Sequence, residues 1–185
     1  MESKCPKIFL ISGKAQAGKD TTATLMKKEY ESKGLKVINL QYSSYIKEYA
    51  KKISGWDGSE ETKPRELLQV LGTDIIRKEL GADFFVKKLV EDLKVYSFFY
   101  DIITISDVRL KIEIDIPRNK FDNIYALRII RPNFDNGLTE EQKMHPTEVD
   151  LDDYENFDYI LMNEGTIPDL GIKVNKMIEE VQHES

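Results

Sequence analysis

The sequence predicts an α/β protein built around a parallel sheet, and three observations lead to that prediction. A short apolar run, residues 7–12, leads directly into a glycine-containing loop and an amphipathic segment. Further apolar runs then alternate with helical patterns along the chain. Charged residues follow apolar runs at 107–109 and at 131, and the carboxyl ends of parallel strands are where such sheets bind ligands. We expect one domain over residues 1–185.

The loop after the first apolar run has the spacing of a phosphate-binding loop. Gly13 and Gly18 are separated by four residues and Lys19 follows, which is the pattern Gly-x-x-x-x-Gly-Lys. Glycine lacks a Cβ, so the backbone can approach a phosphate closely, and successive N–H groups at a helix start form an anion nest. We expect Lys19 to be a catalytic cation for the outer phosphates. The nucleotide-binding residues expected here are Gly13, Lys14, Ala15, Ala17, Gly18, Lys19, Asp20, Thr21 and Thr22.

Asp20 departs from the usual motif, which has Ser or Thr as a magnesium ligand at this position. Magnesium prefers oxygen ligands and keeps several waters, so a carboxylate can hold the hydrated ion. We therefore predict that Asp20 is the metal ligand and that Thr21 faces a phosphate oxygen. The alternative is a glycine turn before a capped helix, in which Asp20 is favourable in the first helical turn.

Composition and charge limit the classes of partner. The net charge of −6 gives no electrostatic case for binding nucleic acid or an anionic membrane surface. The longest apolar runs are far shorter than the ~20 residues of a membrane span, and residues 1–7 contain no apolar secretory core. Cys5 is the only cysteine, which excludes an internal disulfide and suits a reducing compartment. We expect a cytoplasmic protein that binds small molecules.

The first half of the chain is expected to place a long helical insertion between the second and third strands. The helix after the loop has Ala23, Met26 and Tyr30 on one face and ends at Gly34. Pro64 suits the first position of a later helix, which we expect to stop at Gly72. The expected elements are a strand over 7–12, a helix over 21–33, a strand over 35–40, and helices over 43–53, 64–71, 75–80 and 84–96.

The second half is expected to complete the sheet, with strands over 99–106, 123–130 and 157–162 and a last helix over 168–181. Residues 110–116 alternate like a strand, but the α/β pattern favours a short helix that is broken near Pro117. Residues 133–150 are polar and are expected to form a mobile surface loop.

Four arginines are candidates for neutralising phosphate charge, because the planar guanidinium fork binds phosphate bidentately. Arg109 follows a core strand at the ligand edge, and Arg131 precedes the polar loop, where a lid arginine would stand. Arg128 lies within a strand and could instead pair with a surface carboxylate. Arg65 lies on a helix of the insertion, where an arginine is more often solvated.

Other polar and aromatic residues have two interpretations each. Asp107 could orient a water on magnesium or contact the acceptor, or it could be a strand-end cap partnered by Arg109. His145 and Glu148 lie in the polar loop, where a histidine is usually solvated. Phe84 could stack on a base or belong to the core. The turn after the last strand could contact a nucleotide base or be a simple turn; its candidates are Asn163, Gly165 and Thr166.

Five segments, in order along nearly the whole chain, resemble deoxynucleoside monophosphate kinases of the phosphate-loop kinase superfamily. The Gly-Lys-Asp-Thr loop is similar to that family's loop, including its unusual Asp. The other segments are the Arg-x-x-x-Gln-x-x-Gly-Thr run over 65–73, Asp-Val-Arg over 107–109 with Glu113, Arg-Pro at 131–132 with His-Pro-Thr-Glu over 145–148, and the closing segment 158–166. Thr147 is a mild departure, since Ser is usual in the family's lid motif.

The resemblance implies a three-layer phosphate-loop kinase fold with a five-stranded parallel sheet in the order 2-3-1-4-5. It implies a helical acceptor-binding region over about 43–96, a lid over about 132–150, a monomer or homodimer, and ATP and Mg²⁺ as donor and cofactor for phosphorylating a (deoxy)nucleoside monophosphate. The implied catalytic residues are Lys19, Asp107, Arg109 and Arg131, with Asp20, and Asp107 through water, at the metal. Further implied donor contacts are Arg131, Asn163, Gly165 and Thr166, and implied acceptor contacts are Arg65, Gln69, Thr73, Phe84, Asp107, Arg109, His145 and Glu148.

Two alternatives stay open at this point. Relatives with a similar loop include dephospho-coenzyme A kinases and phosphomevalonate kinases, so the acceptor could be another small phosphorylated molecule. The protein could also bind nucleotide without transferring phosphate, as a switch or an ATPase. Such proteins usually lack a second anion site, and a GTP-specific switch would have Asn-Lys-x-Asp where this chain has Asn-Glu-Gly-Thr at 163–166.

Overall fold

The computed structural model describes residues 2–183, apart from the side chains of residues 73 and 74. Its centre is one sheet in which every neighbouring pair of strands is parallel. The spatial order is β2-β3-β1-β4-β5, which confirms the predicted topology. The strands are β1 (Lys7–Ser12), β2 (Val37–Leu40), β3 (Ile102–Val108), β4 (Ile124–Ile130) and β5 (Tyr159–Met162).

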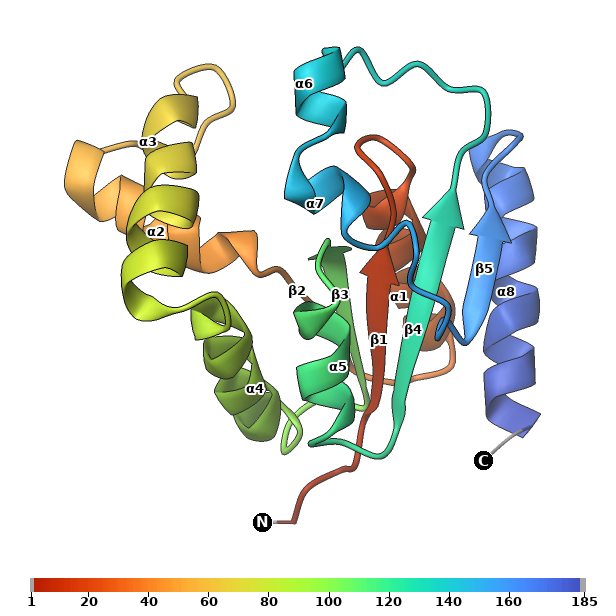
Figure 1. Cartoon of the computed structure of the whole chain (residues 1–185). Helices are drawn as coiled ribbons and strands as arrows, with labels where there is room; N and C mark the ends of the chain where they lie inside the picture. The colour runs from red at the N-terminus through yellow and green to blue at the C-terminus, as the bar shows by residue number, and fades with distance from the viewer. Residues whose placement is uncertain (1, 184–185) are drawn as a thin grey trace.

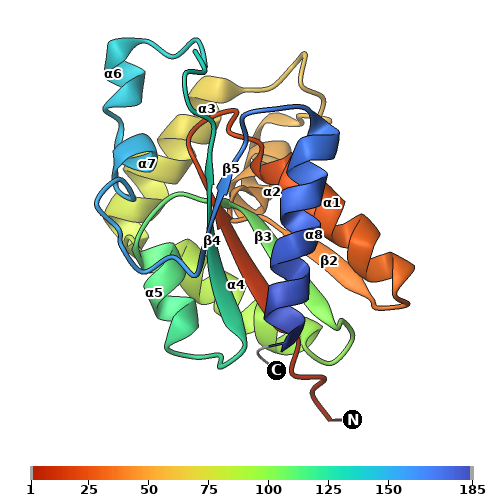
Figure 2. The same ribbon diagram turned by 90° about the vertical axis from the view of Figure 1, so that its right-hand side faces the viewer.

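Helices cover both faces of this sheet, so the predicted three layers are confirmed (Figure 2). Helices α1 (Lys19–Ser32) and α8 (Ile167–His183) pack on one face, and α4 (Phe84–Tyr96) and α5 (Ile112–Arg118) pack on the other. On α1 the buried side chains include Ala23, Met26 and Tyr30, as the helical spacing predicts. The central strand β1 is buried from residue 8 to residue 12, because helices shield it on both sides.

The third strand lies further along the chain than expected. Residues 97–99 form a turn after α4, with the Phe99 N–H donating to the Tyr96 carbonyl at 2.9 Å, and β3 begins only at Ile102. The strand therefore contains Asp107, and Arg109 is the first residue after it.

The ambiguous segment at 110–116 is helical from Ile112 on, as predicted, and the short helix α5 ends at Arg118, one residue after Pro117, which lies inside it. Proline has no N–H, so the carbonyl four residues earlier, that of Glu113, loses its helical donor. The Tyr42 hydroxyl donates to this carbonyl at 2.9 Å and takes the place of the missing N–H. A tertiary contact thus satisfies the group that the sequence alone would leave unpaired.

The helical insertion comprises α2 (Ser43–Ser54), α3 (Arg65–Gln69) and the π-helical η1 (Val70–Leu80), and it stands beside the sheet in Figure 1. The predicted stop at Gly72 is wrong, because α3 continues directly into η1. A Cβ on Gly72 would lie 3.1 Å from Cδ1 of Ile46 in α2, so this glycine allows close packing of two helices. The helical run ends at Gly81, whose φ of +107° suits glycine.

The polar segment at 133–150 is not one continuous loop, which corrects that prediction. It contains α6 (Glu140–Lys143) and α7 (Pro146–Val149). Thr139 and Gln142 form a capping box at the start of α6, and α7 begins with Pro146, where the missing N–H costs nothing. Within residues 2–183, none of the helices combines the length and apolarity that crossing a bilayer requires.

Candidate active site

The phosphate loop joins β1 to α1, and its two glycines are required by close approaches. A Cβ on Gly13 would lie 2.7 Å from the Ile129 carbonyl oxygen, and one on Gly18 would lie 2.7 Å from Nδ2 of Asn163. The same Asn163 amide donates to the Ala17 carbonyl at 2.9 Å. The turn after β5 therefore braces the loop, and a side chain at either glycine would displace it.

Lys19 closes the loop from inside. Its Nζ donates to the carbonyls of Gly13 at 2.8 Å and Lys14 at 2.9 Å, and only 8% of the residue is exposed. Burial, followed by the nearby Arg109 charge, lowers the pKa of Lys19 to about 8. The Lys19 ammonium is thus held by the backbone of the loop that we expect to bind phosphate.

Arg109 emerges beside the phosphate loop, as its place after β3 predicts. Ser12, at the end of β1, is paired with Val108 in β3. The segment that carries Arg109 is held by Glu113, whose Oε2 accepts the N–H of Arg109 at 2.7 Å and that of Leu110 at 3.0 Å. Burial, the largest effect, raises the pKa of the Glu113 carboxyl to about 7.

Glu148 of α7 connects the segment at 133–150 both to the phosphate loop and to Arg109. One carboxylate oxygen accepts the Ala15 N–H at 2.9 Å, and the other pairs with the Arg109 guanidinium. The Glu148 side chain is only 10% exposed. Its carboxylate therefore occupies a place in which backbone N–H and guanidinium donors converge, as they would around a phosphate oxygen.

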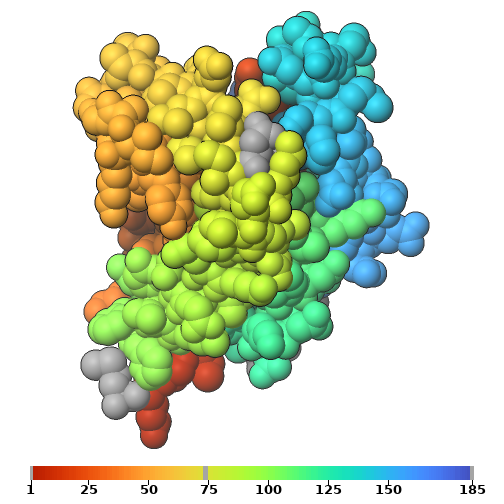
Figure 3. Space-filling model, turned by 60° about the vertical axis from the view of Figure 1, so that its left-hand side comes forward, coloured from red at the N-terminus to blue at the C-terminus, as the bar shows by residue number. Residues whose placement is uncertain are grey.

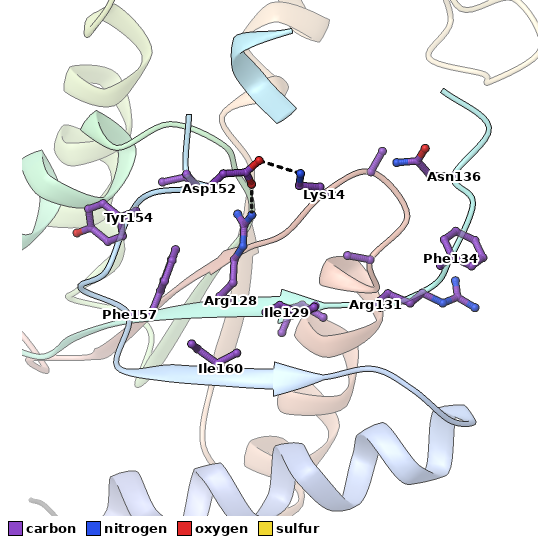
Figure 4. A pocket seen from close by; sticks show the side chains of 14 residues that line it. Lys14, Arg128, Ile129, Arg131, Phe134, Asn136, Asp152, Tyr154, Phe157 and Ile160 are labelled. Carbon is purple, nitrogen blue, oxygen red and sulfur yellow. Dashed lines mark hydrogen bonds and ion pairs between the residues drawn. The ribbon is translucent and has the colours of Figure 1, made fainter. Parts of the chain in front are cut away.

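A second carboxylate, that of Asp152 just after α7, bridges two further cations (Figure 4). Its oxygens accept from Lys14 Nζ at 2.8 Å and from Arg128 at 3.0 Å. These residues line a cavity of about 420 Å³ whose walls also include Phe134 and Phe157. Arg128 thus has the carboxylate partner that the alternative interpretation expected.

Most of the predicted nucleotide contacts surround another cavity, of about 370 Å³, where α1 and α8 begin. The Arg131 guanidinium lies 3.6 Å from the centre of the Phe134 ring and donates to the Gln16 carbonyl at 3.4 Å. Thr22 is turned away, since its hydroxyl donates to the Gly18 carbonyl at 2.9 Å. The residues lining the cavity are Gln16, Gly18, Lys19, Asp20, Thr21, Arg131, Asn163, Gly165, Ile167 and Leu170.

The oxygen donors around Asp20 fit a magnesium ion. Ser106 Oγ donates to Asp20 Oδ1 at 2.7 Å, and Gln41 Nε2 donates to the same oxygen at 3.1 Å, so the carboxylate is held in one orientation. No group of three or more His, Cys, Asp or Glu within residues 2–183 could hold a metal ion by itself. Magnesium is commonly bound through one or two carboxylates together with waters and substrate phosphates, and a single Asp suits that mode.

Asp107 anchors the insertion to the sheet. Its two oxygens accept the backbone N–H groups of Tyr42, at 2.8 Å, and of Ser43, at 2.9 Å, at the start of α2. These hydrogen bonds of Asp107 agree with the capping interpretation, but the element that Asp107 caps is α2, and Arg109 is not its partner. Its expected roles at the metal and at the acceptor remain predictions.

The predicted acceptor residues of the insertion lie in varied surroundings. The Arg65 side chain is 74% exposed and pairs with Glu60 at 2.9 Å, and Gln69 is exposed at the end of α3. Phe84 packs edge-on against Phe85 and lines a separate groove along α4. The side chain of Thr73 lies outside the described residues. The insertion and the α6–α7 segment stand on either side of the same end of the molecule (Figure 3).

Two other predicted contacts are used locally. Nδ1 of His145 accepts the Thr147 N–H at 3.3 Å at the start of α7, and the Thr166 hydroxyl donates to Asp169 at 2.7 Å at the start of α8. These bonds cap helices. Neither residue is joined to the phosphate loop by a described hydrogen bond.

Three polar residues near the site were not singled out from the sequence. Asp152 and Ser106 hold functional side chains from a distance in sequence, so no local spacing marks them. The third is Arg77 in η1, whose buried Nε has no hydrogen-bond partner among the described residues. In the sequence, Arg77 cannot be told from a solvated arginine on a helix surface. Only the burial of its Nε in the folded chain distinguishes it.

Comparison with known proteins identifies relatives of the chain. A family model described as deoxynucleotide monophosphate kinase matches residues 33–174. A protein of Acanthamoeba polyphaga mimivirus that carries the provisional name deoxynucleotide monophosphate kinase is 30% identical over 115 residues. That match covers 56% of this chain and 55% of the mimivirus protein, so the chain spans about half the length of this curated relative.

Several solved kinases share the fold at low sequence identity. The APS kinase of Mycobacterium tuberculosis, in complex with AMPPNP and APS, has a TM-score of 0.58 and 13% identity, and the match covers 94% of this chain and 98% of that one. The dephospho-CoA kinase of Campylobacter jejuni has a TM-score of 0.54 and 15% identity, covering 96% and 98%. The shikimate kinase of Aquifex aeolicus has a TM-score of 0.53 and 13% identity, covering 96% and 99%. At such identities the likeness shows the phosphate-loop kinase fold and not the substrate.

Proposed function

Because this chain belongs to the deoxynucleotide monophosphate kinase family, we propose that it transfers a phosphoryl group from ATP to a deoxynucleoside monophosphate. The products are ADP and the deoxynucleoside diphosphate. The observation that carries the proposal is the placement of the phosphate loop and Arg109 at neighbouring strand ends, with Ser12 paired to Val108. This arrangement supports a donor phosphate chain and an acceptor phosphate side by side.

On the donor side, the triphosphate lies against the loop N–H groups and the Lys19 ammonium. When ATP binds, Lys19 Nζ exchanges its hydrogen bonds to the Gly13 and Lys14 carbonyls for hydrogen bonds to phosphate oxygens. The nucleoside occupies the cavity near Arg131 and the turn at 163–166. The Arg131 ring contact with Phe134 holds a flat cationic surface beside that cavity.

On the acceptor side, Arg109 binds the monophosphate through its guanidinium fork. An oxygen of the acceptor phosphate attacks the terminal phosphorus of ATP, and the bond from that phosphorus to the bridging oxygen of ADP breaks. The acceptor phosphate is already a nucleophile, so no general base is required. Catalysis rests on positioning and charge stabilisation, which Lys19 and Arg109 provide.

Asp20, held by Ser106 and Gln41, is the residue that would hold magnesium. The ion, when bound, neutralises charge on the phosphate oxygens. Asp20 itself contributes a fixed carboxylate at the start of α1, next to the loop N–H groups.

A substrate screen tests the proposal. The protein is incubated with ATP and magnesium and, separately, with each deoxynucleoside and ribonucleoside monophosphate, dephospho-coenzyme A and phosphomevalonate. Products are separated by ion-exchange chromatography, and the Lys19→Ala protein purified in parallel controls for contaminating kinases. We expect at least one deoxynucleoside monophosphate to be converted to its diphosphate with one ADP formed per product.

Two outcomes would contradict the proposal. ADP formation that is independent of every acceptor would identify an ATPase, and phosphorylation of dephospho-coenzyme A or phosphomevalonate alone would identify a kinase of another acceptor.

A further inference from the structure

Arg77 is partly exposed, but one nitrogen of its guanidinium group is buried without a hydrogen-bond partner among the described residues. It lies in the second half of η1, and its Nε atom is inaccessible to solvent and has no hydrogen-bond partner among the described residues. A buried polar group without a partner destabilises the fold, and native proteins retain few of them. Where they are retained, a functional site is the usual reason.

The π-helical spacing explains why Arg77 faces inward. In a π-helix, residues five apart stack on one side, because hydrogen bonds join residue i to i+5. Leu71 and Ile76 are such a pair, and both are buried, at 6% and 4% exposure. Gly72 and Arg77 are the adjacent pair, and Gly72 packs against Ile46 of α2. Arg77 therefore shares the packed side of η1.

Arg77 also lies close enough to the Arg109 segment for its charge to act there. Burial raises the pKa of the Glu113 carboxyl, and the Arg77 charge is one of the effects that oppose this rise. Glu113 is the residue whose Oε2 accepts the Arg109 and Leu110 N–H groups. The charge of Arg77 from the insertion and the backbone N–H of Arg109 from the sheet edge thus act on the same carboxyl group.

We propose that Arg77 is a second guanidinium of the acceptor-phosphate site and binds the monophosphate together with Arg109. The inference rests on the proposed function. The acceptor phosphate carries up to two negative charges, and Arg109 alone supplies one positive charge. Arg109 is paired with Glu148 in this structure, whereas the Arg77 Nε has no described partner. A phosphate oxygen supplies the acceptor that Arg77 lacks.

This assignment distinguishes Arg77 from the other cations of the insertion. The Arg65 side chain is 74% exposed and already has Glu60. Lys51 of α2 pairs with Glu48 on the outer side of the insertion. Arg77 differs from both, because its buried and unpaired Nε destabilises the fold. A bound ligand would supply the missing hydrogen-bond acceptor.

The test combines substrate binding, kinetics and stability for Arg77→Met, Arg77→Lys and the control Lys51→Met. Binding of each deoxynucleoside monophosphate is measured by titration calorimetry, which needs no turnover. Arg77→Met should weaken monophosphate binding and raise its KM by about 10- to 100-fold, the loss expected for charge-assisted hydrogen bonds, and leave the KM for ATP unchanged. Arg77→Lys should recover part of the loss, and Lys51→Met should change neither constant.

Thermal stability separates a ligand contact from a structural role. Arg77→Met removes the unpaired, buried Nε and keeps an apolar stem, so its Tm should be equal to or above that of the unchanged protein. A lower Tm, together with equal losses for both substrates, would show that Arg77 is structural and overturn the inference. Unchanged monophosphate binding would also overturn it. Tight monophosphate binding that depends on Arg77, without any transfer, would instead refute the proposed function alone.

Discussion

The phosphate loop and the helical insertion differ in how their cations are held. Around the loop, Lys19 bonds to two carbonyls and Lys14 pairs with Asp152. In the insertion, Arg65 lies in solvent with Glu60, and the buried Nε of Arg77 has no described partner. The cations of the loop, which we assign to the donor half, are thus held by the protein itself, whereas Arg77 of the insertion, which we assign to the acceptor half, keeps an unpaired Nε.

The two regions are also attached to the fold in different ways. The loop continues a central strand and is braced from both sides by β4 and the turn after β5. The insertion is attached partly by hydrogen bonds at the start of α2. The Asp107 carboxylate accepts the backbone N–H groups of Tyr42 and Ser43, and the Tyr42 hydroxyl donates to the Glu113 carbonyl. The insertion also packs on the core, because Tyr42 and Ile76 belong to one apolar cluster with side chains of α4. Its attachment therefore depends on tertiary contacts, whereas the loop is attached through the backbone of β1 and α1.

The largest effect is expected for Lys19→Ala, which breaks the donor half. It removes the cation that accompanies the transferred group, so kcat should fall by about 10²- to 10³-fold, the range seen when one transition-state contact is lost. Steady-state kinetics with saturating acceptor measures the change, and circular dichroism verifies folding. Near-normal turnover of the folded variant would exclude the phosphate-loop assignment.

Arg109→Lys tests the acceptor half. It keeps the charge and loses the bidentate fork, so the KM for the acceptor should rise by about 10-fold or more while the KM for ATP changes little. Initial rates with each substrate varied in turn provide both constants. A rise confined to ATP would assign Arg109 to the donor half and remove the distinction between the two regions.

The pH dependence of ATP binding reports on the donor half alone. The pKa of Lys19 is about 8 in the folded protein, so its positive charge is lost as pH rises through that value. ATP affinity, measured by calorimetry from pH 7 to 9.5, should therefore decrease above about pH 8 in the unchanged protein. The same group binds fewer protons when folded than when unfolded between pH 8 and 10.5, so its contribution to stability increases with pH there. An affinity profile that is flat across this range would be inconsistent with the buried Lys19 environment.

Asp20→Ala and Asp20→Ser sharpen the account of the metal. The alanine variant should need more magnesium for half-maximal rate and lose about 10-fold in turnover, as one charge-assisted contact is removed. The serine variant keeps an oxygen and should retain more activity. If the magnesium titrations of the unchanged protein and Asp20→Ala coincide, Asp20 is a helix-start residue only.

The smallest effect is expected for Glu148→Gln, which weakens the contacts of α7 with the phosphate loop and with Arg109. The amide keeps the shape but weakens the pairing with Arg109, so a competing anion is removed from the site. Monophosphate and ATP affinities should increase by about 2- to 5-fold, the size of a partly exposed ion pair. Hydrogen exchange across residues 133–150 should show faster exchange in this variant without ligand. A loss of affinity would mean that the carboxylate itself contacts substrate.

Some features were predictable from the sequence because they depend on neighbours in the chain. The glycine spacing at 13 and 18, the apolar face of α1 and the alternation of strands and helices are local patterns, and the structure agrees with each. The strand order came from resemblance and is confirmed. The placement of Arg109 at the loop follows once the strands are parallel neighbours, because their carboxyl ends meet at one edge.

The other features were decided by packing between distant segments. The sequence predicts a helix end at Gly72, but in the structure this glycine lets the helix pack closely against Ile46 of α2. Pro117 reads as a break, but the Tyr42 hydroxyl satisfies the carbonyl that proline leaves open. Glu148, Asp152 and Arg77 resemble solvated surface charges. The roles of Glu148 and Asp152 depend on groups that face them from 24 or more positions away in the chain, and that of Arg77 depends on the burial of its Nε. Local patterns determine secondary structure and the loop, because their energies come from adjacent residues, whereas the partners of buried charges exist only once the chain has folded.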